Sequence, residues 1–221
     1  MICWAAALVV MLAAGTSLAA GAIKGAAPGD FDLYRFSLTW SPGFCASGGI
    51  AKQPDQCDAG SRLGFLVQGL WPQGVPNFPS ECNRGAFVRR GDLDAIHGVL
   101  PSKAFARYEW KKRGICLGSA PSRYFAAISA LYSKTVIRRP CPLPQQDVRA
   151  APLGIERAFA EANPGLRPDV TAISCARCEH ALVLTKIRIC VSKDLRGYQT
   201  CPETVQRQGG LARGILIPAL R

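Results

Sequence analysis

Alternation of apolar and polar positions predicts the first strand of the chain. In residues 31–40 the apolar side chains of Phe36, Leu38 and Trp40 alternate with polar ones. A period of two residues is typical of a strand with one buried face. We therefore expect a strand here, followed by a Gly-, Pro- and Cys-rich loop over residues 41–61.

Two further apolar runs have the length of strands. Residues 63–70 form a short run that ends before Trp71 and Pro72, and this length favours a buried strand. Residues 182–191 form the second run, which is followed by a turn around residues 194–197.

Three segments carry helix signals. Residues 102–113 begin with Ser102, and residues 122–135 begin with Ser122; serine is a favoured N-cap. One helical face of the second segment is apolar, with Phe125, Ile128, Leu131 and Tyr132. Residues 155–162 predict a third helix, which an Asn-Pro-Gly sequence ends. Because helices and a few strands are interspersed, we predict an α+β fold with an antiparallel sheet and helices packed on it.

The first residues of the chain indicate export. Residues 2–14 are almost purely apolar, and Ser17 and Ala19 form a small-x-small cleavage signal. This run is short for a membrane span, so we interpret residues 1–19 as a signal peptide, although the segment carries no Lys or Arg. An uncleaved anchor is the alternative. We predict one domain over residues 20–221, secreted or periplasmic, with no membrane span after processing.

Composition narrows the possible partners. Of the 221 residues, 48% are hydrophobic and 19% are charged, which excludes a disordered chain. Lys and Arg number 27 against 15 Asp and Glu, a net charge of +12. This excess favours a polyanionic partner such as nucleic acid, anionic lipid or acidic glycan, with solubility as the plainer explanation.

Two segments carry candidate chemistry. The apolar run of residues 63–70 delivers the polar Gln68 to a Gly-Leu-Trp-Pro corner. In the helix predicted over residues 102–113, Glu109 lies three residues before Lys112 and four before Arg113, so the three side chains share one face. The alternatives are a structural amide at Gln68 and a solvated charged helix surface.

These segments resemble the two active-site segments of the ribonuclease T2 family, secreted endoribonucleases of α+β fold. Residues 68–72, QGLWP, are similar to the family's His-Gly-Leu-Trp-Pro, and residues 108–116, YEWKKRGIC, to its His-Glu-Trp-x-Lys-His-Gly-Thr-Cys. Residues 36–45 and 188–195 resemble the family's opening and closing strands. The resemblance covers most of residues 31–201.

Three departures concern the family's histidines. Gln68, Tyr108 and Arg113 stand at their positions. The family cleaves RNA by attack of the ribose 2′-hydroxyl on the adjacent phosphate, which needs a base and an acid that titrate near the working pH. Glutamine does not titrate, arginine stays protonated, and tyrosine has a pKa near 10. Each lost acid–base role costs on the order of 10²–10⁴ in rate. The only histidines, His97 and His180, lie outside both motifs.

The binding half of the motif is retained. The resemblance implies that Glu109 and Lys112 are electrostatic partners of the reacting phosphate, and that Trp71 is an aromatic wall for a base. Arg113 adds a planar fork suited to phosphate. Further substrate contacts are expected from neighbours on the same predicted helix, namely Arg107, Trp110 and Lys111.

The cysteines suggest a disulfide scaffold. Cys82 with Cys116 resembles the family bridge between the motif segments. Two further pairs would close local loops: Cys45 with Cys57, and Cys190 with Cys201. Cys141, Cys175 and Cys178 remain, so one of them is expected to be unpaired. The CxxC of Cys175 and Cys178 is also compatible with a redox or zinc half-site, but a single CxxC is weak, and we expect no cofactor or metal.

Three hypotheses follow. The first is an exported T2-type protein that binds RNA or another polyanion and is catalytically impaired. The second is an active endoribonuclease that cleaves single-stranded RNA through a 2′,3′-cyclic phosphate with rearranged catalytic groups. The third is a disulfide-rich module on the same fold that binds a protein partner.

Overall fold

The structure is a computed structural model of the whole chain, and it describes most residues after the predicted leader. The described ranges are 25–58, 60, 62–74, 77–82, 87–135, 145–203 and 214–220. The predicted signal peptide and Cys141 lie outside them. Among the described residues, no helix combines the length and apolar character that crossing a membrane requires.

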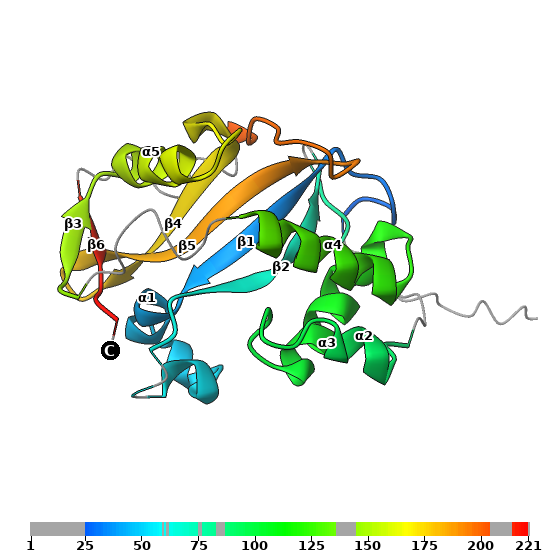
Figure 1. Cartoon of the computed structure of the whole chain (residues 1–221), viewed down its shortest axis with the longest axis horizontal. Helices are drawn as coiled ribbons and strands as arrows, with labels where there is room; N and C mark the ends of the chain where they lie inside the picture. Colours follow the sequence, from blue (N-terminus) through cyan, green and yellow to red (C-terminus); the bar gives the residue numbers. More distant parts are fainter. Residues whose placement is uncertain are drawn as a thin grey trace, which may run out of the picture.

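Within the described ranges, six strands form one sheet (Figure 1). They are β1 (Leu33–Trp40), β2 (Phe65–Gln73), β3 (Val148–Ala150), β4 (Thr171–Cys178), β5 (Ala181–Ser192) and β6 (Ile215–Ile217). The strand order is β2-β1-β5-β6-β3, and β4 pairs with β5. The sheet is antiparallel, as predicted, except that β6 joins the start of β5 in parallel, with Val183 opposite Leu216.

The helices are α1 (Ser41–Ala46), α2 (Arg90–Asp94), α3 (Lys103–Lys112), α4 (Pro121–Lys134) and α5 (Pro152–Ala162). Short 3₁₀ turns are η1 (Gly49–Ala51), η2 (Pro54–Cys57), η3 (Gly114–Leu117) and η4 (Pro168–Val170). The predicted α+β class is therefore confirmed. The segment expected to be loop after β1 instead forms α1, η1 and η2.

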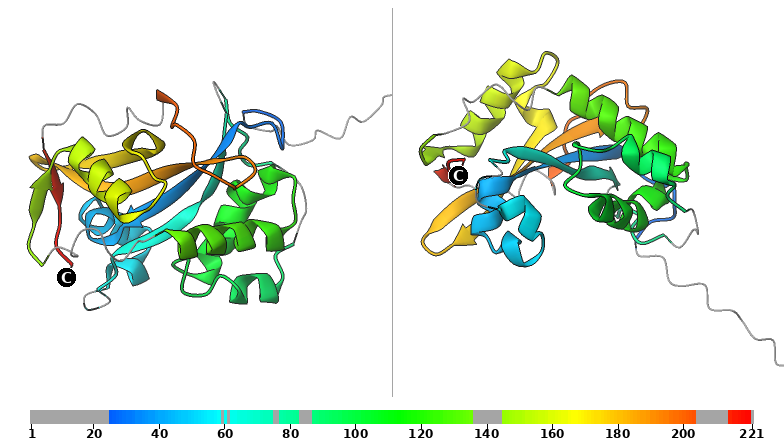
Figure 2. Two further views of the ribbon diagram at one scale, coloured as in Figure 1. Left: turned by 45° about the horizontal axis from the view of Figure 1, so that its top comes forward. Right: turned by 60° about the horizontal axis from the view of Figure 1, so that its bottom comes forward.

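Strand β1 explains how the sheet separates a core from a polar face. Phe36, Leu38 and Trp40 are fully buried in the main hydrophobic core, together with Phe125 of α4 and Phe159 of α5. Helices α4 and α5 lie along the same face of the sheet (Figure 2). Side chains alternate along a strand, so the polar residues of β1 are directed to the opposite face.

Strand β2 runs further than its apolar pattern indicates. It continues through Trp71 and Pro72 to Gln73, and Pro72 pairs with Tyr34. Because β2 is the first strand in the sheet order, Pro72 lies on an edge, where the missing N–H of proline is tolerated.

Two serines expected to cap helices behave differently. Ser102 caps α3, with its hydroxyl accepting a hydrogen bond from the Phe105 backbone N–H at 3.1 Å. Ser122 does not cap α4, because the helix starts one residue earlier, at Pro121, with Ala120 as its N-cap. Proline at the first helical position has a φ angle suited to helix initiation.

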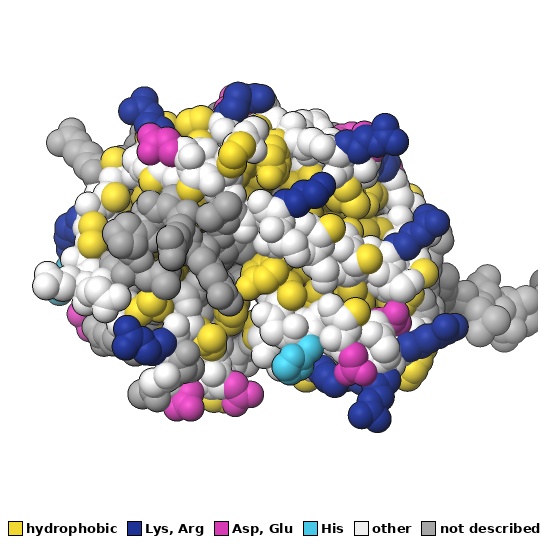
Figure 3. Space-filling model, viewed as in Figure 1, with side chains coloured by type: hydrophobic (Ala, Val, Ile, Leu, Met, Phe, Trp, Pro, Cys, Tyr) yellow, Lys and Arg dark blue, Asp and Glu magenta, His cyan; other side chains and the backbone are white. Residues whose placement is uncertain are grey.

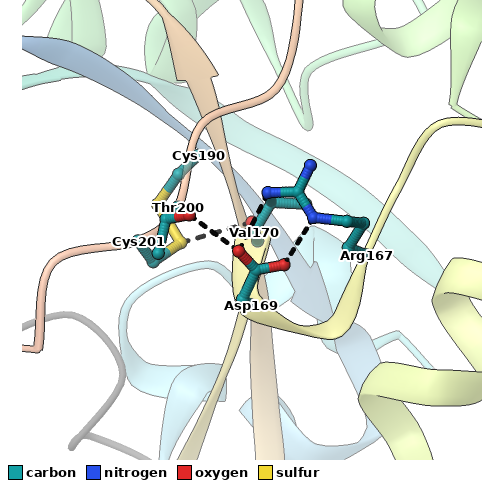
Figure 4. A network of polar contacts seen from close by, with 6 residues as sticks. All are labelled: Arg167, Asp169, Val170, Cys190, Thr200 and Cys201. Carbon is teal, nitrogen blue, oxygen red and sulfur yellow. Dashed lines mark hydrogen bonds and ion pairs between the residues drawn. A yellow bond between two sulfur atoms is a disulfide. The ribbon is translucent and has the colours of Figure 1, made fainter.

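Among the described residues there are three disulfides, and all three were expected from the sequence. Cys82–Cys116 joins segments that are far apart in the chain, whereas Cys45–Cys57 and Cys190–Cys201 close local loops. The Cys190–Cys201 disulfide lies next to a network of polar contacts that holds the segment after β5 in place (Figure 4). Asp169 accepts two hydrogen bonds of 2.9 Å from the Arg167 guanidinium and one of 2.7 Å from the Thr200 hydroxyl. The closing segment is thereby attached to the start of β4.

Candidate active-site cleft

One cleft of about 830 Å³ collects the chemistry-bearing residues of both motifs. Strand β2 contributes Gln68 and Trp71 to its lining. Helix α3 and the residue after it contribute Tyr108, Glu109, Lys112 and Arg113. The turn η2 and the residues just before α3 close its sides. The two segments that the sequence singled out therefore meet in space.

A β-bulge directs Gln68 into the cleft. Ser37 pairs with Gly69 and Leu38 pairs with Val67, so Gln68 is an extra residue on β2 without a partner on β1. Such bulges redirect a side chain and occur often beside active sites. The Ser37 hydroxyl donates a hydrogen bond of 3.2 Å to Gln68 Oε1, which orients the amide.

Gly69 allows β2 and α3 to approach each other closely. A Cβ atom at this position would lie 2.9 Å from Glu109 Oε2 and 2.7 Å from Trp71 Nε1. Neither distance is compatible with an ordinary side chain in the present arrangement. The glycine of the QGLWP segment is thus required by the contact between Trp71 and Glu109.

Glu109 is the most perturbed acid of the cleft. It is 4% exposed and accepts a hydrogen bond of 2.7 Å from Trp71 Nε1. Burial raises the pKa of Glu109 to about 7, although the Trp71 hydrogen bond and the charges of Arg113, Lys112 and Lys186 act in the opposite direction. Glu109 can therefore exchange a proton near neutral pH, unlike an exposed carboxylate.

Tyr108 and Lys112 form a pair at the mouth of the cleft. Lys112 Nζ donates a hydrogen bond of 2.9 Å to the Tyr108 hydroxyl and lies 5.3 Å from the centre of its ring. Tyr108 is half-exposed. The phenol thus holds in place the lysine that the family resemblance assigns to the phosphate.

Three cations surround Trp71. The distances to its ring centre are 4.8 Å from Arg35 Cζ, 5.5 Å from Arg113 Cζ and 5.9 Å from Lys186 Nζ. Trp71 is only 8% exposed. Stacking of a base on this ring, the role implied by the family resemblance, would require the surrounding side chains to move aside.

The remaining expected substrate contacts lie outside the cleft. Trp110 is buried in the core, with its ring centre 5.6 Å from that of Tyr124. A substrate cannot reach it without rearrangement of the core, so the structure gives Trp110 a packing role in place of the expected substrate contact. Arg107 and Lys111 are exposed on α3 but do not line the cleft.

Neither histidine lines this cleft. His97 is exposed between α2 and α3, and His180 lines a second cleft of about 870 Å³ beside the turn between β4 and β5. Neither His97 nor His180 is therefore in position to replace the family's catalytic histidines.

Cys175 and Cys178 have free thiols on β4. Three residues along a strand span roughly 10 Å, and the side chains point to opposite faces. A disulfide between them would need Cα atoms about 4–7 Å apart. Among the described residues there is also no group of three or more metal-ligating side chains. In this arrangement Cys175 and Cys178 are not joined to each other.

Sequence reasoning missed Arg35 and Lys186, together with Arg188 beside them. The sequence feature that could have pointed to these residues is the presence of basic residues inside two predicted strands. Arg35 interrupts β1, and Lys186 and Arg188 alternate with isoleucines in β5. Their convergence on Trp71 depends on the pairing of β1 with both β2 and β5, which the pattern alone does not provide.

Comparison with known proteins gives a consistent result. A family model described as the Ribonuclease T2 family matches residues 31–201. A ribonuclease of Aeromonas hydrophila is 35% identical over 106 residues, which cover 48% of this chain and 47% of that protein. Ribonuclease I of Escherichia coli K12 is 27% identical over 191 residues, covering 61% and 71% of the two chains. The match spans about half the length of the relatives from Aeromonas hydrophila and Haemophilus influenzae.

Solved structures share the fold at low identity. An RNase-related protein from Calystegia sepium superposes with a TM-score of 0.64 at 21% identity, covering 86% of this chain and 98% of that one. RNase NT, solved in complex with 5′-AMP, gives a TM-score of 0.62 at 19% identity, covering 86% and 99%.

Proposed function

Because the chain belongs to the ribonuclease T2 family, we propose that it is an exported member that binds RNA or another polyanion, with its endoribonuclease activity lost or strongly reduced. The observation that carries this proposal is the cleft itself. Gln68, Tyr108 and Arg113, which the motif resemblance aligns with the family's histidines, line one cavity together with Lys112.

Loss of activity follows from proton chemistry. In the family reaction the 2′-oxygen forms a bond to phosphorus, the bond from phosphorus to the 5′-oxygen breaks, and one proton is removed while another is delivered. The Gln68 amide does not titrate, and a guanidinium is a poor proton donor and no base, so neither Gln68 nor Arg113 has the acid–base chemistry of an imidazole. Two lost acid–base roles correspond to roughly 10⁴ or more in rate.

Binding of a polyanion follows from charge. Lys112 and Arg113 line the cleft, and the chain carries a net charge of +12. A guanidinium in place of imidazole keeps a permanent positive charge and a planar donor fork for phosphate oxygens. The substitution at Arg113 therefore removes proton transfer and strengthens the attraction for phosphate.

The test compares the purified protein with a Gln68→His/Tyr108→His/Arg113→His variant on single-stranded RNA. We expect the unchanged protein to bind RNA with an affinity that falls steeply with salt and to leave it uncut, while the triple variant cleaves it. The Arg90→Gln variant, which removes an exposed charge of α2 outside the cleft, controls for net charge. Cleavage by the unchanged protein at the rate of the triple variant would refute the proposal.

A second candidate function rests on Glu109. A carboxyl group with a pKa of about 7 next to the Tyr108–Lys112 pair could accept the 2′-hydroxyl proton, and the chain would then remain an endoribonuclease that forms a 2′,3′-cyclic phosphate. Glu109→Gln separates the two candidates. Measurable cleavage that this substitution abolishes, with unchanged RNA affinity, would establish the active enzyme.

A further inference from the structure

The cations around Trp71 form a cluster that neither motif includes. We define the Trp71 cation cluster as Arg35, Arg113 and Lys186, whose charged groups lie within 6 Å of the indole centre. They come from β1, from the end of α3 and from β5. On the helix-covered face Lys and Arg side chains are spread apart over the surface (Figure 3), whereas here three converge on one ring.

The cluster contains buried donors without protein partners. Arg35 is 8% exposed, and its Nε atom makes no hydrogen bond within the described chain. The Nη1 atom of Arg113 is buried and lacks a partner as well. A buried guanidinium donor that remains without a hydrogen-bond partner destabilises the folded protein, because it has lost its hydration and gained nothing in return. Indole faces attract these cations, but they do not accept in-plane N–H hydrogen bonds as oxygen atoms do.

The cluster also lacks compensating negative charge. Burial, followed by the charge of Arg188, lowers the pKa of Arg35 to about 9 and that of Lys186 to about 8. Among the described residues, Glu109 is the carboxylate whose charge raises the pKa of Lys186, and it already accepts the Trp71 N–H. Three cations, two of them with unused guanidinium donors, are thus held beside Glu109, whose own pKa is about 7.

We propose that the Trp71 cation cluster is a second binding site for a phosphate group, which shares Arg113 with the position that Lys112 serves and adds Arg35 and Lys186. Tetrahedral phosphate offers several oxygen acceptors and the charge that the cluster lacks, and arginine forks bind it in a bidentate manner. Trp71 and Arg113 line the cleft, whereas Arg35 and Lys186 do not, so a phosphate in the cleft meets the cluster from the side of Arg113. The phosphate is either one of an RNA backbone already bound in the cleft, which rests on the proposed function, or free inorganic phosphate, which does not.

The first experiment uses inorganic phosphate alone as the probe. The midpoint of thermal unfolding is measured against phosphate concentration, with chloride at equal ionic strength as reference. A ligand at about 100 times its Kd raises the midpoint of a protein of this size by about 5–10 °C. We expect this rise in the unchanged protein, in Lys112→Gln and in the control Arg90→Gln. It should be lost in Arg35→Gln and in Lys186→Gln.

Arg35→Gln and Lys186→Gln are independent tests of the same site. Lys186 is only partly buried, so Lys186→Gln remains informative if Arg35→Gln does not fold. A rise that is lost in Lys112→Gln and kept in Lys186→Gln would place the phosphate at the family position and overturn the proposal. A rise no larger than that produced by chloride would overturn it as well.

The second experiment identifies the source of the phosphate. RNA affinity is measured over a range of salt concentrations for the unchanged protein and for Lys186→Gln. If RNA occupies the cluster, the variant binds more weakly and its salt slope decreases by about one ion. If affinity and slope are unchanged while thermal protection is lost, the ligand is free phosphate. Failure of the unchanged protein to bind RNA would refute the proposed function and leave the phosphate result of the first experiment standing.

Discussion

The two faces of strand β1 obey different physical rules. Phe36, Leu38 and Trp40 are buried against α4 and α5, where apolar contact alone satisfies them. Arg35 and Ser37, on the other face, are equally inaccessible but need specific partners from β2 and β5. One strand therefore carries a face that tolerates any well-packed apolar arrangement and a face on which each polar atom needs its own acceptor or donor.

The largest expected loss of stability comes from a substitution on the apolar face of β1. Phe36→Ala should lower the free energy of unfolding by about 3–5 kcal/mol, because it removes a fully buried ring and leaves a cavity. Urea unfolding measures this loss. Phe87→Ala is the matched control, because Phe87 is 81% exposed and its truncation should change stability by less than about 0.5 kcal/mol.

The next largest expected effect is a pH dependence of stability, which arises from Glu109 on the polar side of the sheet. Burial raises the pKa of Glu109 from 4.5 to about 7, so the folded state binds the proton more tightly than the unfolded chain. The resulting stabilisation is complete below about pH 4.5 and is lost as the pH rises through 7, a change on the order of 3 kcal/mol. In the Glu109→Gln variant, the free energy of unfolding should therefore depend less on pH between about 4.5 and 7.

Glu156 on α5 is the control for that profile, because burial raises its pKa to about 7 too. Glu156→Gln should remove a separate part of the slope without affecting the cleft. If Glu109→Gln leaves the profile unchanged while Glu156→Gln flattens it completely, Glu109 is already ionised in the acidic range.

Gly69→Ala tests the approach of β2 to α3. The added Cβ would meet Glu109 Oε2 and Trp71 Nε1, so we expect a loss of about 1–3 kcal/mol from overpacking and weaker RNA binding. Gly91→Ala, at a position where a Cβ meets nothing, should not decrease either quantity. Equal stability of the Gly69 variant and the unchanged protein would show that the contact adapts freely.

The smallest effect concerns a helix cap. Ser102→Ala removes the hydroxyl that accepts from the Phe105 N–H and should cost about 1 kcal/mol. Ser122→Ala, which affects an exposed serine without a capping role, should cost less than about 0.5 kcal/mol. Thermal unfolding of the pair checks the difference, and equal losses would contradict the assigned cap.

The elements that sequence analysis predicted are those whose signals are local. The alternation in β1 and the N-cap of α3 depend on a few neighbouring residues, and both are confirmed. Ser122 misled because Pro121 next to it is the stronger signal for helix initiation. The short strand β6 was missed because its parallel pairing with β5 is set by tertiary contacts.

Within the site, the motif predicted which residues meet, but not how each one is used. Glu109, Lys112 and Arg113 were expected to share a helix face, and they line the cleft together with Tyr108 and Gln68. The enclosure of Trp71 by Arg35 and Lys186 was not predictable, because it requires the register of three strands. Trp110 lies beside these residues in sequence, but the helical period turns it into the core.

The bulge in β2 has a consequence for evolutionary drift. Gln68 is the one residue between Val67 and Gly69 that the ladder with β1 does not use. A chain lacking it would pair continuously, with every flanking side chain on its present face. The sheet consequently imposes little constraint on the side chain at position 68. A lineage can exchange a histidine for a glutamine there at almost no expense to folding, so reactivity can disappear while the architecture persists.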